Sequence, residues 1–271
     1  SGNLENQFNG TNDRNSIETV DVSSNGFTGS LPSALFNSPS LQTFIGSENC
    51  FSGSISSDIC VAVGLVTLDL SGLTAGCATN YKFAAFDFYT AAFIGGEIPE
   101  CLFTLPNITS LYISGNGIRS QLYDIPVTSH LVNLSLSNNR LYGTIPQSLQ
   151  QKSSMQFLDM SFNQLSGTIS DMDNYTLIEG NENRSLSIHL ESNYLSGHIP
   201  SSFSINILNG NIFSCISTAS LPQNDPNVLK YSCGSDVLNG YVYTWLVLVF
   251  VSLLVFSWLY YVASTLAVVI E

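Results

Sequence analysis

Charged residues are scarce in this sequence, and basic residues most of all. Only 10% of the residues are charged, and 7 Lys and Arg stand against 20 Asp and Glu, which gives a net charge of −13 at pH 7. Proteins that bind nucleic acids neutralise phosphates with clusters of Lys and Arg. The composition therefore argues against a nucleic-acid partner, and the net negative charge discourages anionic partners in general.

Catalytic and cofactor-binding signatures are also missing. The sequence has no GxSxG, HExxH or P-loop motif, and no GxGxxG between a strand and a helix. The three histidines, His130, His189 and His198, are scattered, and none lies at zinc-binding spacing from a cysteine. We therefore expect no enzymatic activity, no cofactor and no bound metal.

The cysteines and glycosylation sequons favour an oxidising compartment. None of the six cysteines forms a CxxC pair (Cys50, Cys60, Cys77, Cys101, Cys215 and Cys233). An even number without metal-ligand spacing is typical of disulfides. Asn-x-Ser/Thr sequons occur at Asn9, Asn107, Asn133, Asn174 and Asn183. No signal peptide is visible, so we expect either that a signal was removed or that the chain is a piece of a longer protein.

A repeat of about 24 residues organises most of the sequence. One copy runs from Leu131 to Pro146 and reads LxxLxLxxNxLxGxIP. Its first apolar position recurs at residues 17, 41, 65, 83, 108, 131, 155 and 185, which predicts eight coils. Alternate side chains of each LxL core point inward as in a β-strand, and stacked coils share one continuous core.

The recurrent Asn of the repeat follows each predicted strand, where the chain turns sharply. An Asn amide can bond the backbone groups that such a turn leaves free. We therefore predict that these residues are largely buried and form a ladder along one edge of the coils: Asn25, Asn116, Asn139, Asn163 and Asn193.

Four departures interrupt the repeat. In the third coil Leu73 replaces the Asn, and that coil is shorter than the others. The coil predicted to begin at Phe83 also lacks the Asn and places Phe86 and Phe88 at apolar positions. An insertion at Asp171–Arg184 precedes the last regular coil.

The C-terminal segment predicts a single membrane anchor. Residues 237–270 carry no formal charge, and a helix needs about 20 apolar residues to cross a bilayer. The repeat domain is then extracellular or lumenal, at the plasma membrane or an endomembrane. Ser257, Ser264 and Ala267 fall on one helical face, which favours contact with another membrane helix, although such hydroxyls as often bond their own helix.

The repeat resembles the plant-type leucine-rich repeat, over roughly residues 17–215. The resemblance implies an α/β-type leucine-rich-repeat solenoid of short parallel β-strands with a 3₁₀ or irregular convex side, plus one C-terminal transmembrane α-helix. The expected divisions are a degraded N-terminal coil or fragment start (1–16), the solenoid (17–213), a disulfide-closed cap and linker (214–236) and the transmembrane helix (237–271).

The resemblance also implies a cap closed by a Cys215–Cys233 disulfide, after the decayed repeat that ends in Cys215. The other four cysteines allow three pairings. Short loops favour Cys50–Cys60 with Cys77–Cys101.

The resemblance implies a cell-surface receptor, a receptor-like protein or a secreted inhibitor that recognises ligands with the concave or lateral face. Aspartates recur at the outward position of the predicted strands, at Asp21, Asp69, Asp87 and Asp159. They could hold a cation or calcium, but LDLS is common in this repeat type and favours a structural role. Aromatic side chains are better binding candidates. The candidate ligand face comprises Tyr89, Tyr112, Phe157, Asp159, Phe162 and His189.

We therefore expect a membrane-anchored extracellular protein that binds a protein, peptide or glycan ligand and contacts the lipid bilayer. The alternative is a non-catalytic structural subunit of a larger membrane or extracellular assembly, with other membrane subunits as partners of the helix.

Overall fold

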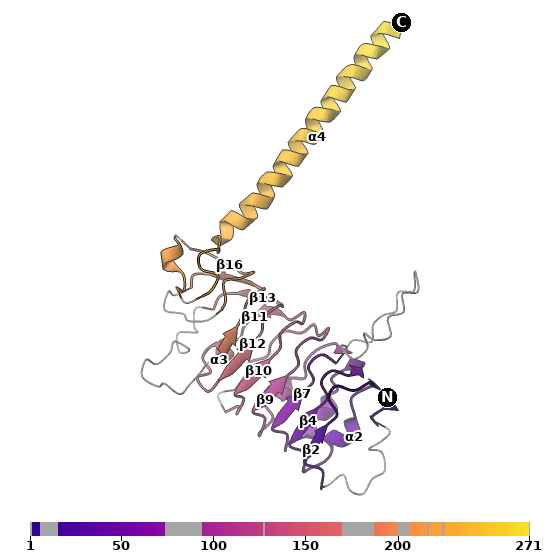
Figure 1. Cartoon of the computed structure of the whole chain (residues 1–271), viewed down its shortest axis with the longest axis vertical. Coiled ribbons are helices and arrows are strands. Elements are labelled where there is room, and N and C mark those ends of the chain that lie inside the picture. The colour runs from indigo at the N-terminus through magenta and orange to yellow at the C-terminus, as the bar shows by residue number, and fades with distance from the viewer. Residues whose placement is uncertain are drawn as a thin grey trace.

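A curved stack of coils carries one long helix at its C-terminal end in the computed structural model (Figure 1). The structure describes residues 2–5, 16–73, 94–126, 128–169, 187–199, 206–215, 217–223 and 225–270. Within the C-terminal helix, it describes the side chains of residues 242–260.

The main sheet has seven parallel strands in chain order. They are β2 (Thr19–Asp21), β4 (Thr43–Ile45), β7 (Thr67–Asp69), β9 (Ser110–Tyr112), β10 (Asn133–Ser135), β12 (Phe157–Asp159) and β14 (Ser187–His189). The central residue of each strand is buried, because alternate side chains of a strand point to opposite faces. This arrangement confirms the predicted leucine-rich-repeat solenoid.

The predicted place of a coil at Phe83, between β7 and β9, is wrong, because no strand lies between these two in the main sheet. The two strands pair directly, with Leu68 opposite Leu111. Leu70 N–H donates to Tyr112 O at 2.7 Å across the same junction. The predicted coil at Phe83 lies outside the described residues, and the third coil resumes at the buried Ile94. The phenylalanine spacing after Phe83 therefore predicted a repeat that the strand order does not contain.

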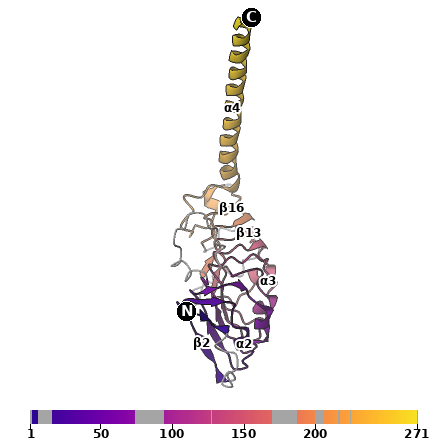
Figure 2. The same cartoon turned by 90° about the vertical axis from the view of Figure 1, so that its right-hand side faces the viewer.

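Shorter elements form the rest of each coil. Three smaller parallel sheets contain β1 (Gly2–Asn3), β3 (Phe27–Gly29) and β5 (Cys50–Phe51); β6 (Gly53–Ser54) and β8 (Ile94–Gly95); and β11 (Tyr142–Thr144), β13 (Gln164–Gly167), β15 (Tyr194–Gly197) and β16 (Ile212–Phe213). The helical turns are α2 (Ser33–Phe36), η2 (Ser57–Val61), η4 (Glu100–Phe103), α3 (Gln147–Gln150) and η6 (Thr218–Ser220). Figure 2 shows α2 and α3 on the side opposite the main sheet.

The proline and glycine of the repeat have separate structural roles. Pro32, Pro99 and Pro146 immediately precede α2, η4 and α3, where the missing N–H of proline costs no helical hydrogen bond. The recurrent glycine has a positive φ, which is +86° at Gly167, where an added Cβ would lie 2.8 Å from Thr144 Cγ2. Only glycine satisfies both requirements at that position.

A ladder of buried asparagines joins successive coils. Asn163 is representative, because its amide donates to Leu136 O of the preceding coil at 3.0 Å and its Oδ1 accepts from Leu141 N–H at 3.0 Å. The buried members are Asn49, Asn116, Asn139, Asn163, Asn193 and Asn211. Each therefore satisfies backbone groups of two coils at once.

Asn25 departs from the prediction, because it is exposed. Its amide donates only within its own coil, to Val22 O at 3.1 Å and Ser23 O at 2.8 Å. Among the described residues, no preceding coil offers it an N–H donor or a second carbonyl. Among the residues that the structure describes, Asn25 is thus the first member of the ladder.

The C-terminal cap closes the last coil with a disulfide and two buried polar contacts. Cys215 and Cys233 are bonded, with their Cα atoms 5.3 Å apart. Asp225 is 2% exposed, and its Oδ2 accepts from the N–H groups of Ile207 and Leu208 at 2.9 and 3.0 Å. Tyr231 donates its hydroxyl to Phe213 O at 3.1 Å, and burial raises the pKa of that hydroxyl to about 12.

The favoured pairing of Cys50 with Cys60 and of Cys77 with Cys101 is wrong. The structure bonds Cys60 to Cys101, with their Cα atoms 5.6 Å apart. Cys60 lies in η2 and Cys101 in η4, and these two turns pack side by side in successive coils. Stacking therefore brings together cysteines that are distant in sequence. Cys50 is also disulfide-bonded, and Cys77 lies outside the described residues.

The C-terminal helix α4 (Gly234–Ile270) begins three residues before the predicted start of the membrane segment. Its segment Val242–Tyr260 is long and apolar enough to span a bilayer, with a mean hydropathy of 2.2, and none of it is buried against the solenoid. The hydroxyls of Ser252 and Ser257 donate to carbonyls of their own helix, Val249 O and Leu254 O. The side chains of Ser264 and Ala267 lie outside the described residues.

Candidate ligand-binding face

The concave face of the main sheet brings three of the predicted ligand residues into one row. Tyr112, Ser135, Asp159 and His189 are partners in the four consecutive strands from β9 to β14. Asp69 precedes Tyr112 in the same row. Tyr89, the other predicted aromatic of this region, and Asp87 lie outside the described residues. The strand register thus sets Asp159 and His189 side by side, and Tyr112 lies in the same row with Ser135 between it and Asp159.

A parallel row adds Phe157 beside His189. Asn133, Phe157 and Ser187 are partners in β10, β12 and β14. The Phe157 ring lies 6.3 Å from the His189 ring, with an interplanar angle of 52°. The C-terminal end of the face therefore combines an aromatic ring, an imidazole and the Asp159 carboxylate.

Glu191 belongs to this cluster although it was not among the predicted ligand residues. Its Oε1 lies 3.8 Å from His189 Nδ1, and its side chain is 15% exposed. On the other side of the ring, His189 Nε2 lies 2.8 Å from the Ser187 hydroxyl. The sequence signal for Glu191 was the HxE pattern, in which His189 of β14 and Glu191 two residues later both face outward. The imidazole is held between a hydroxyl and a carboxylate.

The recurrent aspartates fold back onto the turns that follow their strands. Asp21, Asp69 and Asp159 each accept the backbone N–H two residues later, at 2.9, 2.9 and 3.0 Å. The hydrogen bonds from Ser23 lower the pKa of Asp21. Among the described residues, no group of three or more His, Cys, Asp or Glu is arranged to hold a metal ion. These contacts support the structural role of the aspartates.

Small polar side chains occupy the centre of the face. The hydroxyl of Ser114 lies 2.6 Å from that of Ser135 and accepts from Ser137 at 3.1 Å. The half-buried sequon residue Asn133 donates its amide to Ser110 Oγ at 3.0 Å. Asn107 is exposed at the edge of its coil. The sequons at Asn9, Asn174 and Asn183 lie outside the described residues.

Phe162 is set apart from the row. It lies in the turn after β12 with φ of +54°, and it is 51% exposed. A bulky residue in the left-handed region is strained by about 1–2 kcal/mol. Phe162 therefore offers exposed aromatic surface in the turn after β12, where its backbone N–H donates to Glu191 O at 2.9 Å.

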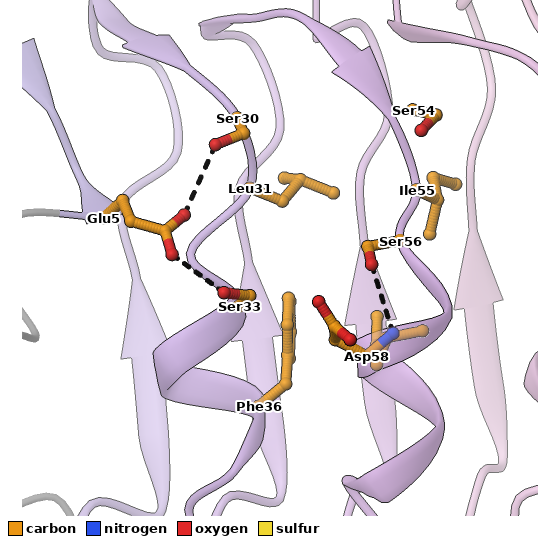
Figure 3. Close-up of a pocket in the computed structure, with 10 residues that line it drawn as sticks. Glu5, Ser30, Leu31, Ser33, Phe36, Ser54, Ile55, Ser56 and Asp58 are labelled. Carbon is orange, nitrogen blue, oxygen red and sulfur yellow. Dashed lines mark hydrogen bonds between the residues drawn. The ribbon is translucent and has the colours of Figure 1, made fainter.

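A cavity of about 260 Å³ lies away from this face, between α2 and η2 (Figure 3). Leu31, Phe36 and Ile55 are among its buried apolar lining residues. The carboxylate of Glu5 accepts from the hydroxyls of Ser30 and Ser33 at 3.3 and 2.7 Å. These bonds attach the N-terminal residues to the first coil. We therefore interpret the cavity as a gap in the packing between these segments.

Parallel LxL strands, a buried asparagine ladder and a disulfide-closed cap define a leucine-rich-repeat protein, and the chain belongs to that class. The Leucine Rich Repeat family model matches residues 16–38 and 130–151. Receptor-like protein 32 of Arabidopsis thaliana is 32% identical over 199 residues, which are 69% of this chain and 22% of that protein.

Solved ectodomains of plant receptors share the fold. The ectodomain of the Arabidopsis receptor kinase HAESA, in complex with an N-terminally extended IDA peptide hormone, is 25% identical with a TM-score of 0.59, over 73% of this chain and 30% of that chain. HAESA in complex with IDA and the co-receptor SERK1 is 26% identical with a TM-score of 0.51, over 73% of this chain and 34% of that one. This chain spans 22% of the length of Receptor-like protein 32.

Proposed function

We propose that this chain is a membrane-anchored extracellular receptor-like protein that binds a peptide on its concave face and has no catalytic activity of its own. The observation that carries the proposal is the row that contains Tyr112, Asp159 and His189, with Phe157 beside it. A peptide hormone is the ligand in the HAESA complex.

The chemistry of the row defines the ligand that fits. Strands lie about 4.8 Å apart, so an extended peptide that crosses them meets a new side chain at each coil. Tyr112 and Phe157 supply rigid aromatic surface, which contributes strongly to binding energy. The carboxylates of Asp159 and Glu191 favour a basic side chain in the ligand.

A random peptide library selected against the full chain in nanodiscs tests the proposal. Selected peptides should lose about tenfold or more in affinity with F157A or D159N, because each change removes one anchoring contact. The matched control is Thr43→Ala, in the N-terminal part of the row that contains Phe157. The assignment to this face would be contradicted if the selected peptides bound F157A and D159N as tightly as they bound Thr43→Ala.

The membrane helix separates the receptor role from a scaffold role. The hydroxyl bonds of Ser252 and Ser257 within α4 support an isolated anchor. Cysteine cross-linking along residues 250–268 in native membranes should then give no helical pattern of products. Strong cross-links at a helical period would instead favour the alternative, a subunit that assembles through its helix. Lumenal or extracellular exposure of the solenoid is part of the same proposal.

A further inference from the structure

The sheet formed by β11, β13, β15 and β16 presents a surface that differs in charge from the rest of the protein. Its four strands contain no Asp or Glu, whereas the whole chain has a net charge of −13. Arg119 and Arg140 are both exposed along its first strand. This lateral surface is separate from the concave face of the main sheet.

The two arginines flank one tyrosine. The Arg119 guanidinium lies over the Tyr142 ring, 5.5 Å from its centroid. Arg140 lies two residues before Tyr142, and alternate residues of an extended segment point to the same side. Stacking on the ring orients the Arg119 guanidinium before any ligand arrives.

Both guanidiniums are free to bind an anion. Within the described parts of the chain, neither forms an ion pair with a carboxylate within 4.0 Å. Lys152, by contrast, is 7% exposed and already donates to Ser129 O at 2.7 Å. Glu97 borders the patch, because it follows Gly96, whose carbonyl accepts the backbone N–H of Arg119 at 3.0 Å.

The rest of the surface is suited to sugars. Tyr142 of β11 is 36% exposed and Tyr194 of β15 is 59% exposed, which gives two aromatic surfaces, one on each side of β13. Thr144 and Gln164 add an exposed hydroxyl and an exposed amide beside them. Aromatic rings cover the apolar faces of sugar rings, while amides and hydroxyls bond their hydroxyl groups.

We propose that this lateral surface, defined by Arg119, Arg140, Tyr142 and Tyr194, binds an acidic polysaccharide that carries carboxylate groups. The planar fork of each guanidinium matches a sugar carboxylate. An acidic peptide would engage the arginines equally well but would make less use of the tyrosines and the amide and hydroxyl groups. Repulsion from distant acids is screened beyond about 8 Å at physiological salt, so the local patch decides the binding.

Binding of oligogalacturonate to the full chain in phosphatidylcholine nanodiscs tests the proposal. The double variant R119Q/R140Q should bind about tenfold more weakly or worse, because it removes two charge-assisted contacts. Lys230→Gln removes one exposed positive charge in the cap and should change the affinity by less than about twofold. The fully methyl-esterified saccharide lacks the carboxylates. It should bind the unmodified protein about as weakly as oligogalacturonate binds R119Q/R140Q.

Two further variants distinguish this site from the concave peptide site and from a site for acidic peptides. D159N should leave saccharide binding unchanged, so that failure of the concave peptide site and failure of this site are distinguishable. Tyr194→Ala should weaken binding of the saccharide but not of poly-L-glutamate. The proposal is overturned if oligogalacturonate does not bind, if R119Q/R140Q binds it like Lys230→Gln, or if poly-L-glutamate binds as tightly as the saccharide.

Discussion

Removal of the Asn139 side chain should weaken the junction between two coils by about 2 kcal/mol. Asn139 is 9% exposed, and its Oδ1 accepts from Ile118 N–H at 3.3 Å, whereas its amide donates to Ile113 O at 2.8 Å and to Leu136 O at 3.1 Å. The two carbonyls keep other partners in Asn139→Ala, because the amides of Asn116 and Asn163 also bond them.

The Ile118 N–H is therefore the group that loses its acceptor. A buried donor left without a partner costs about 1–3 kcal/mol. Trp245 and Trp258 both lie in α4, so tryptophan fluorescence would not report on the solenoid. Hydrogen exchange measured by mass spectrometry resolves the coils and is the better assay.

Peptides that cover residues 113–142 should exchange about 30-fold faster in Asn139→Ala, which is the rate equivalent of 2 kcal/mol. The control is Asn25→Ala, where an exposed amide bonds only its own coil and the expected cost is below about 0.5 kcal/mol. Equal effects of the two substitutions, or unchanged exchange in Asn139→Ala, would refute the ladder as the link between coils.

Three other predictions follow from the same structure. Disulfide mapping should find Cys60 linked to Cys101, and the C60S/C101S variant should lose about 4 kcal/mol in the chain-entropy model, since the bond joins residues 41 apart; a Cys50–Cys60 peptide would contradict the stacking of η2 on η4. Because the pKa of Tyr231 is raised to about 12, the stability that its neutral hydroxyl gives the cap should be complete below pH 10 and should be lost as the pH rises through 12; Tyr231→Phe should show no such loss when cap unfolding is followed by limited proteolysis. Mass spectrometry of material from the native host should find glycan on the exposed Asn107, and a chain with no occupied sequon would argue against the secretory topology.

The repeat period was sufficient to predict the main sheet and its row of outward residues. An LxL core specifies which side chains are buried, and a constant coil length places equivalent residues side by side. Tyr112, Asp159 and His189 therefore fall in one row, as the strand register shows. The same reasoning put Asp87 between Asp69 and Tyr112, because periodicity alone cannot distinguish an inserted segment from a degraded coil.

The cysteine pairing and the exposure of Asn25 depend on contacts between coils rather than on local sequence. A preference for short loops could not anticipate Cys60–Cys101, because stacking of η2 and η4 decides that pair. Asn25 matches the repeat as well as Asn139 does. Burial of its side chain, however, requires a preceding coil that packs against it, and the local motif does not specify one. Glu191 lies outside the strand and enters the candidate site through its contact with His189.

Photo-cross-linking of a selected peptide to the full chain tests the central claim most directly. A benzophenone placed along the peptide should label β9, β10, β12 and β14, at residues 110–112, 133–135, 157–159 and 187–189, and D159N should abolish the labelling of the last two strands. Labelling confined to the convex turns α2, η2 and α3, or labelling of the concave strands that D159N does not change, would contradict a peptide-binding receptor face at this end of the solenoid.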